Sequence, residues 1–237
     1  MPKRNNVHLW QCDLTLHDYL FFATTKRGRV RETGEFIHNY SLTYALGWAR
    51  SGWCTERQEP QYEQQLGNVD GIYVTPGHLI AGSHTLMSYR TEMSGYALPT
   101  SLDQNNTNCG IVRCFRPGSV FRFYVLARFY LDNIPPLVRL GRFMTKAEVA
   151  TQYPVEFAVV EGDYIASSLL NWNDIASKPS LCDVIMYALP GRLIRNARFT
   201  GVRYVEAKFV DGNTVKLPLD MGYYQNELCS TWLGDAA

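Results

Sequence analysis

The sequence predicts an α+β protein in which antiparallel sheet outweighs helix. Runs of β-branched and aromatic residues recur along the whole chain, and short clusters of Gly, Pro, Asp and Asn separate them. Helical periodicity is confined to short segments such as Glu35–Arg50. No internal repeat or low-complexity tract interrupts the 237 residues, a length that suits one elaborated domain or two small ones.

The N-terminal part of the chain predicts a strand, a basic loop and a helix in that order. Val7–Thr25 is dense in β-formers and indicates the strand, while Glu35–Arg50 carries one apolar face and indicates a helix that Thr33 would cap. The loop Lys26–Arg31 between them holds four cations in six residues. Such a loop can aim cations and backbone N–H groups at a phosphate, although a solvated turn has the same composition.

The next structured segment, Gly71–Tyr89, contains no Asp, Glu, Lys or Arg. Strand-forming residues flank Pro76–Gly77 and Gly82–Ser83, so the segment predicts an extended hairpin. An uncharged hairpin is either a buried pair of strands or a projecting arm that a partner covers. The sequence leaves both alternatives open.

A second basic segment follows the strands that are expected over Ile111–Leu131. Arg139, Arg142 and Lys146 surround a glycine, and Thr145–Glu148 fits the capping box that begins a helix. Cations beside a helix N-terminus form a possible anion site, although many structural turns have the same residues.

The C-terminal third predicts more sheet and a third basic segment. We expect a strand over Val155–Glu161, a helix over Tyr164–Ala176 and a strand over Leu181–Leu189. A hairpin should join Arg203–Val210 to Thr214–Leu219, with Val205, Ala207, Phe209, Val215, Leu217 and Leu219 facing the core. From Val184 to Val205 there is no acidic residue, but there are four arginines: Arg192, Arg195, Arg198 and Arg203.

The overall composition points to local patches rather than to a strongly charged surface. The net charge is +1, only 19% of the residues are charged, and 13% are aromatic. A free, non-specific nucleic-acid binder is usually much more basic. The six cysteines form no CxxC pair and no zinc-ligand spacing, so we expect no metal and no cofactor. The N-terminus lacks the apolar core of a signal peptide, and we expect a cytoplasmic protein that does not enter a membrane.

Three segments resemble one protein family. IHNYSLTYALGWA, Pro136–Val149 and the strand-rich run from Ala188 are similar to the type I-D form of the Cas-five branch of CRISPR-associated RAMP proteins. The resemblance implies a single domain over residues 1–237 with an RRM-like, ferredoxin-like β-α-β-β-α-β core. It also implies an inserted β-hairpin, the thumb, at about residues 60–100.

The same resemblance implies a function and partners. The protein would be a non-catalytic subunit of a Cascade complex that holds the 5′ handle of CRISPR RNA and contacts the backbone and large subunits, with target DNA near the flanking motif as a further possible partner. The RNA-binding candidates are Lys26, Arg27, Arg29, Arg31, His38, Arg139, Arg142, Lys146, Arg192 and Arg195. The thumb candidates are His84, Met87 and Tyr89.

Two alternatives remain. Some relatives cut precursor CRISPR RNA without a metal, and His38, Tyr40 and Lys26 have the side chains that such an endoribonuclease needs. However, the five histidines are scattered along the chain, and Tyr40 and Tyr44 are expected in the core more than at RNA. The other alternative is an unrelated α+β interaction module whose basic loops serve solubility.

Overall fold

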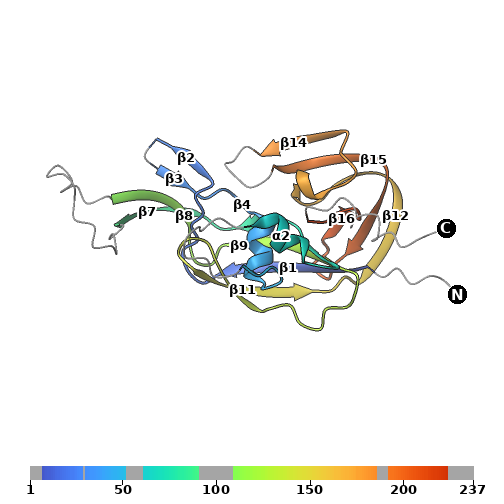
Figure 1. Ribbon diagram of the computed structural model, residues 1–237, viewed down its shortest axis with the longest axis horizontal. Helices are drawn as coiled ribbons and strands as arrows, with labels where there is room; N and C mark the ends of the chain where they lie inside the picture. Colours follow the sequence, from blue (N-terminus) through green and yellow to red (C-terminus); the bar gives the residue numbers. More distant parts are fainter. Residues whose placement is uncertain (1–6, 29, 52–60, 91–108, 186–191, 224–237) are drawn as a thin grey trace.

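The computed structural model describes residues 7–28, 30–51, 61–90, 109–185 and 192–223 (Figure 1). Three β-sheets and a few short helices make up this part of the chain, so the prediction of a largely antiparallel protein is confirmed. Among the strand pairs of the described residues, β3 with β8 is the parallel one. None of the helices in these ranges is long and apolar enough to cross a membrane.

A seven-stranded sheet forms the centre of the molecule. Its strands, in spatial order, are β10 (Leu137–Leu140), β11 (Thr145–Gln152), β1 (His8–Leu16), β9 (Val120–Ala127), β6 (Gly77–Ala81) and β4 (Phe36–Ile37), and β5 (Ile72–Val74) also pairs with β9. Both faces of β1 are covered, because Leu9 belongs to one hydrophobic cluster and Trp10 to another. Buried strands of this kind are rich in apolar residues on both faces.

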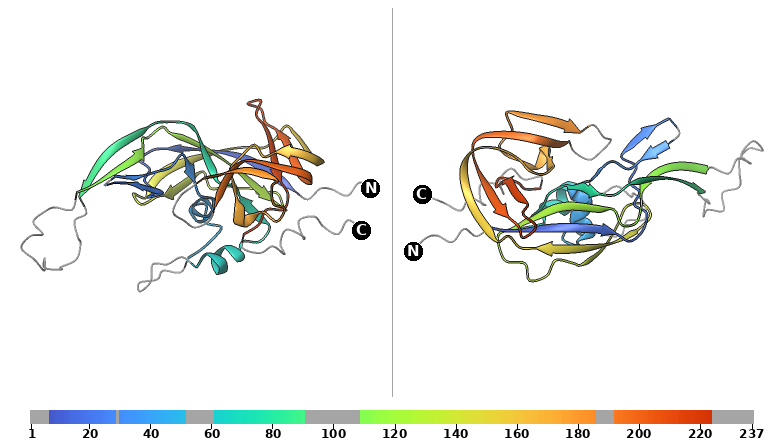
Figure 2. Two further views of the ribbon diagram at one scale, coloured as in Figure 1. Left: turned by 90° about the horizontal axis from the view of Figure 1, so that it is seen from above. Right: turned by 180° about the vertical axis from the view of Figure 1, so that it is seen from behind.

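Two further sheets flank the central one (Figures 1 and 2). The five-stranded sheet is built on the long strand β15 (Leu193–Lys208), which pairs with β12 (Glu156–Ile165), β13 (Leu170–Asn171), β14 (Leu181–Ile185) and β16 (Thr214–Pro218). The four-stranded sheet has the order β2 (Thr25–Arg27), β3 (Val30–Glu32), β8 (Cys109–Phe115) and β7 (His84–Arg90). Strands β7 and β8 form an arm that extends away from the rest of the molecule (Figure 2).

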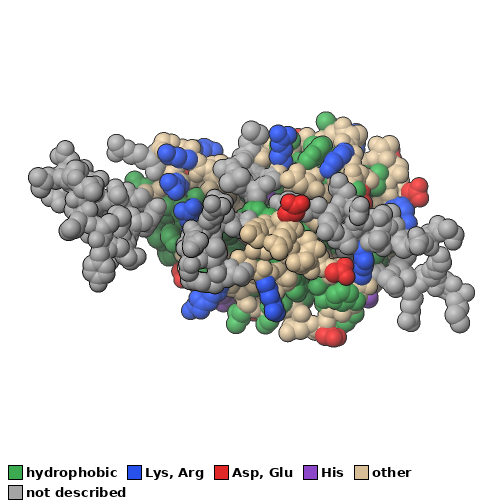
Figure 3. Space-filling model, in the orientation of Figure 1, with side chains coloured by type: hydrophobic (Ala, Val, Ile, Leu, Met, Phe, Trp, Pro, Cys, Tyr) green, Lys and Arg blue, Asp and Glu red, His purple; other side chains and the backbone are tan. Residues whose placement is uncertain are grey.

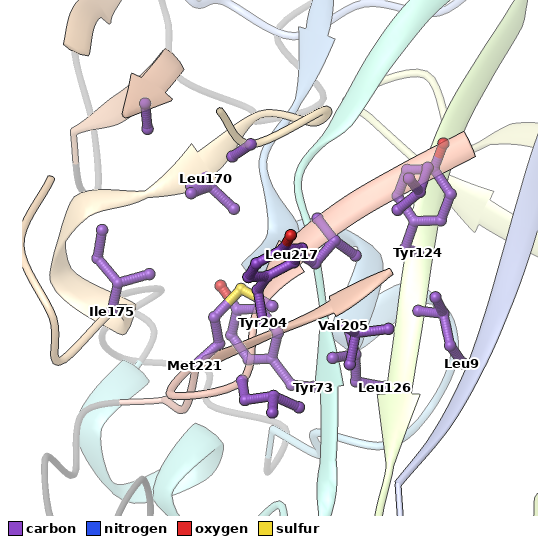
Figure 4. Packing of buried hydrophobic residues seen from close by; sticks show 14 of the residues in the cluster. Leu9, Tyr73, Tyr124, Leu126, Leu170, Ile175, Tyr204, Val205, Leu217 and Met221 are labelled. Atoms are coloured by element: carbon purple, nitrogen blue, oxygen red, sulfur yellow. The ribbon is translucent and has the colours of Figure 1, made fainter. Parts of the chain in front are cut away.

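The larger hydrophobic cluster joins the central sheet to the five-stranded sheet. Leu9 and Leu126 of the central sheet lie in one cluster with Val205 and Leu217 of the other (Figure 4). The six residues that the C-terminal hairpin was predicted to bury are all buried, and strands β15 and β16 confirm that hairpin.

The helix predicted over Glu35–Arg50 is much shorter in the structure. Phe36–Ile37 is strand β4, which pairs with β6, and α1 covers only Asn39–Ala45. His38, not Thr33, is the N-cap, and Gly47 at φ +76° follows the end of the helix. The predicted helix is therefore too long at both ends. Before α1, the backbone of Phe36–Ile37 pairs with β6 and so adopts strand geometry. After α1, Gly47 in the left-handed conformation ends the helix. A second helix, α2 (Tyr62–Gly67), precedes β5.

The opening strand and the Gly71–Tyr89 hairpin also need correction. Strand β1 ends at Leu16, well before the predicted end at Thr25. The segment Gly71–Tyr89 forms β5, β6 and most of β7, but these strands do not pair with one another: β5 and β6 pair with β9, and β7 pairs with β8. Burial in the central sheet therefore accounts for the missing charge of β5, whereas β6 is buried only at Gly77 and exposes Ile80 and Ala81.

The two helices predicted in the second half are wrong. Thr145–Val149 belongs to strand β11, in which Thr145, Ala147 and Val149 are buried alternately. The Thr145 hydroxyl donates to the carbonyl of Tyr19 at 2.6 Å instead of capping a helix. Within the predicted helix Tyr164–Ala176, the chain forms the end of β12, the short strand β13 and one 3₁₀ turn, η2 (Trp172–Asp174). Alternation of period two is the stronger signal wherever a strand can bury one face.

Candidate nucleic-acid interface

A cleft with a volume of about 580 Å³ opens between the four-stranded and the five-stranded sheets. Strands β2, β3 and β8 contribute one wall, β14 and β15 contribute the other, and β4 and β6 of the central sheet lie between them. In Figure 3, Lys and Arg side chains gather over β2–β3 and again over β14–β15. The residues around the cleft include Arg27, Glu32, Phe36, His78, His84, Arg113, Ser168, Leu169, Ile185 and Arg195.

On the first wall, Glu32 forms ion pairs with two arginines. Its carboxylate lies 3.2 Å from Arg27 Nε and 3.4 Å from Arg113 Nη1. The Glu32 side chain is only 14% exposed, whereas Arg27 remains 78% exposed. One carboxylate cannot occupy all the donors of two guanidinium groups, so both arginines keep N–H groups for an anionic ligand.

Strand pairing also places the cations of the basic segment Lys26–Arg31 on different faces of the β2–β3 pair. Thr25 is opposite Glu32, and Lys26 is opposite Arg31 in the β2–β3 pair. Residues that lie opposite each other share a face and neighbours along a strand alternate, so Lys26 and Arg31 lie on the face away from Thr25 and Arg27. Arg29 lies outside the described residues.

On the second wall, a local irregularity of β15 exposes two polar residues in succession. Asn196 has φ +53°, and both Arg195 and Asn196 are exposed. Asn196 donates to Asp183 of β14 at 2.7 Å, and Arg195 Nε lies 3.7 Å from the same carboxylate. In a regular strand, the residue after exposed Arg195 would point into the core. The irregularity instead turns the Asn196 side chain toward the cleft. Arg192 is exposed just before β15, outside the set of cleft residues.

Two histidines lie in the cleft, in different environments. His84 Nε2 is 2.9 Å from the carbonyl oxygen of Thr33, and its ring centroid lies 3.9 Å from that of Phe115. Burial lowers the pKa of His78, and the Arg122 guanidinium lowers it further, while Asp13 opposes the shift. Among the described residues, no group of His, Cys, Asp and Glu side chains is arranged to hold a metal ion.

The second predicted basic segment lies at a different cavity of about 370 Å³. Arg139 and Arg142 line it together with Ser41 and Tyr44 of α1, and it shares no residue with the cleft. Lys146 is opposite Arg139 in the β10–β11 pair, so these two cations share a face. The expected helix dipole is absent here because β11 replaces the helix.

The remaining candidate residues lie in the interior or on the arm. His38 is buried and accepts a hydrogen bond from the backbone N–H of Tyr40 through Nδ1, and burial lowers its pKa to about 3. Tyr40 is buried and Tyr44 is half-buried, as expected of core residues. Met87 packs toward buried Val112 at the base of the arm. The side chain of Tyr89 lies outside the described part of the structure.

Arg27, His84 and Arg195 are thus brought to one cleft, although the sequence separates them by up to 168 positions. Sequence reasoning missed Arg113, His78 and Ser168, which line the same cleft. Arg113 stands in an alternating run, Ile111–Phe115, which marks it as the outward residue of a half-buried strand. His78 and Ser168 carry no comparable signal.

A family model described as type I-D CRISPR-associated protein Cas5/Csc1 matches residues 7–226. The chain belongs to this family. The match confirms the resemblance carried by the segments around α1, β10–β11 and the C-terminal sheet. It also rules out the interpretation as an unrelated interaction module.

Comparison with solved structures finds a remote similarity. One similar chain belongs to a cryo-EM structure of the type III-B Cmr-β complex bound to cognate target RNA and AMPPnP. It is 11% identical, the match covers 87% of this chain and 86% of that chain, and the TM-score is 0.43. Comparison with curated proteins gives no match.

Proposed function

We propose that this chain is a non-catalytic RNA-binding subunit of a type I-D Cascade complex and that it holds the 5′ handle of CRISPR RNA in the cleft. The observation that carries the proposal is the convergence of Arg27, Arg113 and Arg195 from two sheets onto one cleft. Guanidinium groups on opposite walls can bind successive phosphates of one strand. Membership in the Cas5/Csc1 family supports CRISPR RNA as the ligand.

The arm supports a role for partners in the same complex. Leu86 and Ile111 of β7 and β8 are 66% and 42% exposed, and Leu86 is opposite the cleft residue Arg113. We place the thumb on this arm, where it would pack on guide RNA and on the backbone subunit beyond the end of the cleft. Contacts with the large subunit, and with target DNA near the flanking motif, complete the proposed assembly in the cytoplasm.

The RRM-like, ferredoxin-like RAMP core is part of this proposal. The order β1, α1, β5–β6 and β9 within and against the central sheet supports it. The second helix of such a core has no long counterpart after β9 in the described residues, where η2 is a single turn.

The alternative is a metal-independent endoribonuclease. It is favoured by His78 and His84, which lie with arginines in one cleft and have the side chains used in acid–base cleavage of RNA. His38, the earlier candidate, is buried and caps α1. Because His84 Nε2 already contacts the Thr33 carbonyl and the pKa of His78 is lowered, we favour binding without cleavage.

The proposal is tested with charge-reversed proteins and a single-stranded handle RNA from the host. Arg27→Glu with Arg195→Glu should weaken binding at least tenfold and reduce the log–log salt slope by roughly 0.7 for each lost phosphate contact. Lys208→Glu is the control, since Lys208 is an exposed cation at the far end of the same strand β15. Equal RNA affinities for the double variant and the Lys208→Glu control would show that the cleft is not the RNA-binding site.

The same samples decide between binding and cleavage. We expect precursor RNA incubated with the protein in chelator to remain at full length after hours. Shortened RNA that His78→Ala or His84→Ala protects would establish the nuclease instead.

A further inference from the structure

An acidic side chain lies among the arginines that the cleft offers to RNA. Both Glu32 and Glu35 line the cleft. A carboxylate in the wall of a phosphate-binding cleft repels the phosphates and lowers the positive potential of the arginines. The Glu32 side chain is also only 14% exposed, and partial removal of its charge from water costs free energy. In a cleft that binds RNA, both effects of Glu32 need a compensating interaction.

The four-stranded sheet places Glu32 between two arginines. Strand β3 lies between β2 and β8, and Glu32 is directly opposite Arg113 in the β3–β8 pair. On the other side, Arg27 shares its face of β2 with Thr25, which is opposite Glu32. Two strand spacings, together about 10 Å, separate β2 from β8. The Glu32 carboxylate therefore stands in the middle of this gap and forms ion pairs with both arginines.

The backbone of Glu32 is fixed on both sides. Its carbonyl oxygen accepts hydrogen bonds from the backbone N–H of Thr24 at 3.0 Å and from the Thr24 hydroxyl at 2.8 Å. The N–H of the next residue, Thr33, donates to the carbonyl of Arg113 at 2.9 Å. By contrast, the Arg27 and Arg113 side chains are 78% and 43% exposed. A carboxylate on a fixed backbone is thus paired with two long side chains that have room to move.

We infer that Glu32 is a positioning residue, which holds the guanidinium groups of Arg27 and Arg113 in place for RNA phosphates. The inference rests on the proposed RNA-binding function and assigns a role to a residue that does not itself contact RNA. An unpaired arginine side chain loses rotamer freedom when it binds a ligand, whereas a paired one has already lost part of that freedom. The carboxylate also reduces the repulsion between two cations on one face of the sheet.

Positioning and simple repulsion predict effects of opposite sign. If Glu32 only adds negative charge to the cleft, Glu32→Gln strengthens RNA binding. If Glu32 positions the two arginines, the same change weakens RNA binding, although the cleft becomes more positive. Glu35 is the matched control, because it is exposed at the same cleft and takes part in none of the ion pairs found among the described residues. Glu35→Gln should bind RNA at least as tightly as the native protein.

The experiment measures the affinity of the full chain for the single-stranded handle RNA at low ionic strength, where electrostatic binding is strongest. In the native background, Glu32→Gln should weaken binding about fivefold, the effect of ordering about one arginine side chain again. In a protein that carries both Arg27→Gln and Arg113→Gln, Glu32 has no arginine to position. There, Glu32→Gln should leave the affinity unchanged or raise it, because only the repulsion is removed.

Thermal unfolding of the same proteins serves as the check on folding. Glu32→Gln should change Tm by no more than about 4 °C, because ion pairs with exposed arginines contribute little to stability. A structural effect of the substitution would weaken RNA binding to the same extent with and without the two arginines. An effect that reverses when the arginines are absent must act through them.

Three other results would contradict the inference. If Glu32→Gln strengthens binding in the native background as Glu35→Gln does, Glu32 only adds negative charge, and the positioning role is wrong while the proposed function stands. If Glu32→Gln weakens binding equally in both backgrounds, the role of Glu32 is structural. If the native protein does not bind the handle RNA, the proposed function fails, and the positioning role fails with it.

Discussion

Asp174 is a buried carboxyl group that joins α1, β5 and η2. Its oxygens accept hydrogen bonds from Asn39 Nδ2 at 2.6 Å, Tyr40 OH at 2.8 Å and Tyr73 OH at 3.1 Å. Burial nevertheless raises its pKa from 3.8 to about 7, while the hydrogen bonds oppose that rise. The folded protein therefore binds a proton at Asp174 more tightly than the unfolded chain does.

This pKa shift predicts how stability changes with pH. A group whose pKa is raised by folding stabilises the protein below its unfolded pKa and loses that contribution as pH rises through the folded pKa. Between pH 4 and pH 7 the Asp174 contribution should decline by up to about 4 kcal/mol. We expect Asp174→Asn, which imitates the protonated carboxyl, to flatten the dependence of Tm on pH in this window. Asp132→Asn, at an exposed position, is the control; identical slopes for the native protein and Asp174→Asn would contradict the assignment.

Residue types were predictable from the sequence, but the partners of buried polar residues were not. His38 and Tyr40 were recognised as residues of interest within the predicted helix Glu35–Arg50. The structure makes His38 a cap and directs the Tyr40 hydroxyl to Asp174, which is 134 positions away in the chain. Local spacing carries no information about a partner at that separation.

Among the elements, the β7–β8 arm has two distinct faces. Val112 and Cys114 are fully buried on one face, whereas Leu86 and Ile111 are exposed on the other. The exposed face begins at Arg113, so it continues the wall of the cleft. An exposed apolar strand face without a covering element is a feature of interaction surfaces.

The arm should therefore be needed for assembly and not for folding. We expect Leu86→Lys combined with Ile111→Glu to keep the Tm within about 2 °C of the native value, because surface changes have small effects. The same protein should fail to co-purify with the other Cascade subunits. A comparable pair of changes at exposed Val155 and Val210 should leave assembly intact. Normal assembly of the arm variant, measured by size-exclusion chromatography, would show that the thumb lies elsewhere.

Element type could be predicted where one pattern dominated locally. The C-terminal hairpin alternates strictly around Asp211–Asn213, and it was predicted with its buried residues. At Thr145–Val149 a helix-capping pattern and a strand alternation coincide in the same residues. Pairing with β1 and β10 decided for the strand, and no local signal contains that pairing.

At the scale of the whole molecule, Arg122 ties two sheets together. Its guanidinium donates twice to Asp13 of the neighbouring strand, at 2.7 Å each, and lies 3.1 Å from Asp211. Asp211 belongs to the turn between β15 and β16 and also accepts from Gln11 at 3.0 Å. These contacts fix the five-stranded sheet on the central one and so set the position of one wall of the cleft.

Loss of the Arg122 contacts with Asp13 and Asp211 should destabilise the folded protein. Arg122→Met leaves Asp13 without its main partner in a place where the Asp13 side chain is only 24% exposed. We expect a loss of about 2 kcal/mol, which lowers Tm by about 4–8 °C in a protein of this size. Arg195→Met is the control, because Arg195 and Asp183 are both more than half exposed and such pairs contribute about 0–1 kcal/mol. Equal Tm values for the two variants would mean that apolar packing alone joins the sheets.

The sequence by itself determined the class of fold, the family and the positions of the basic segments. Each of these depends on patterns among residues that are close in the chain: alternation, turns, motif order and clusters of cations. Only the tertiary structure decided which basic segments act together. It united Arg27 with Arg195, placed Arg139 and Arg142 at another cavity, and added Arg113, His78 and Ser168 to the cleft. The physical reason is that a cleft between sheets depends on strand pairing and on burial between distant segments, which contribute their free energy only once the chain has folded.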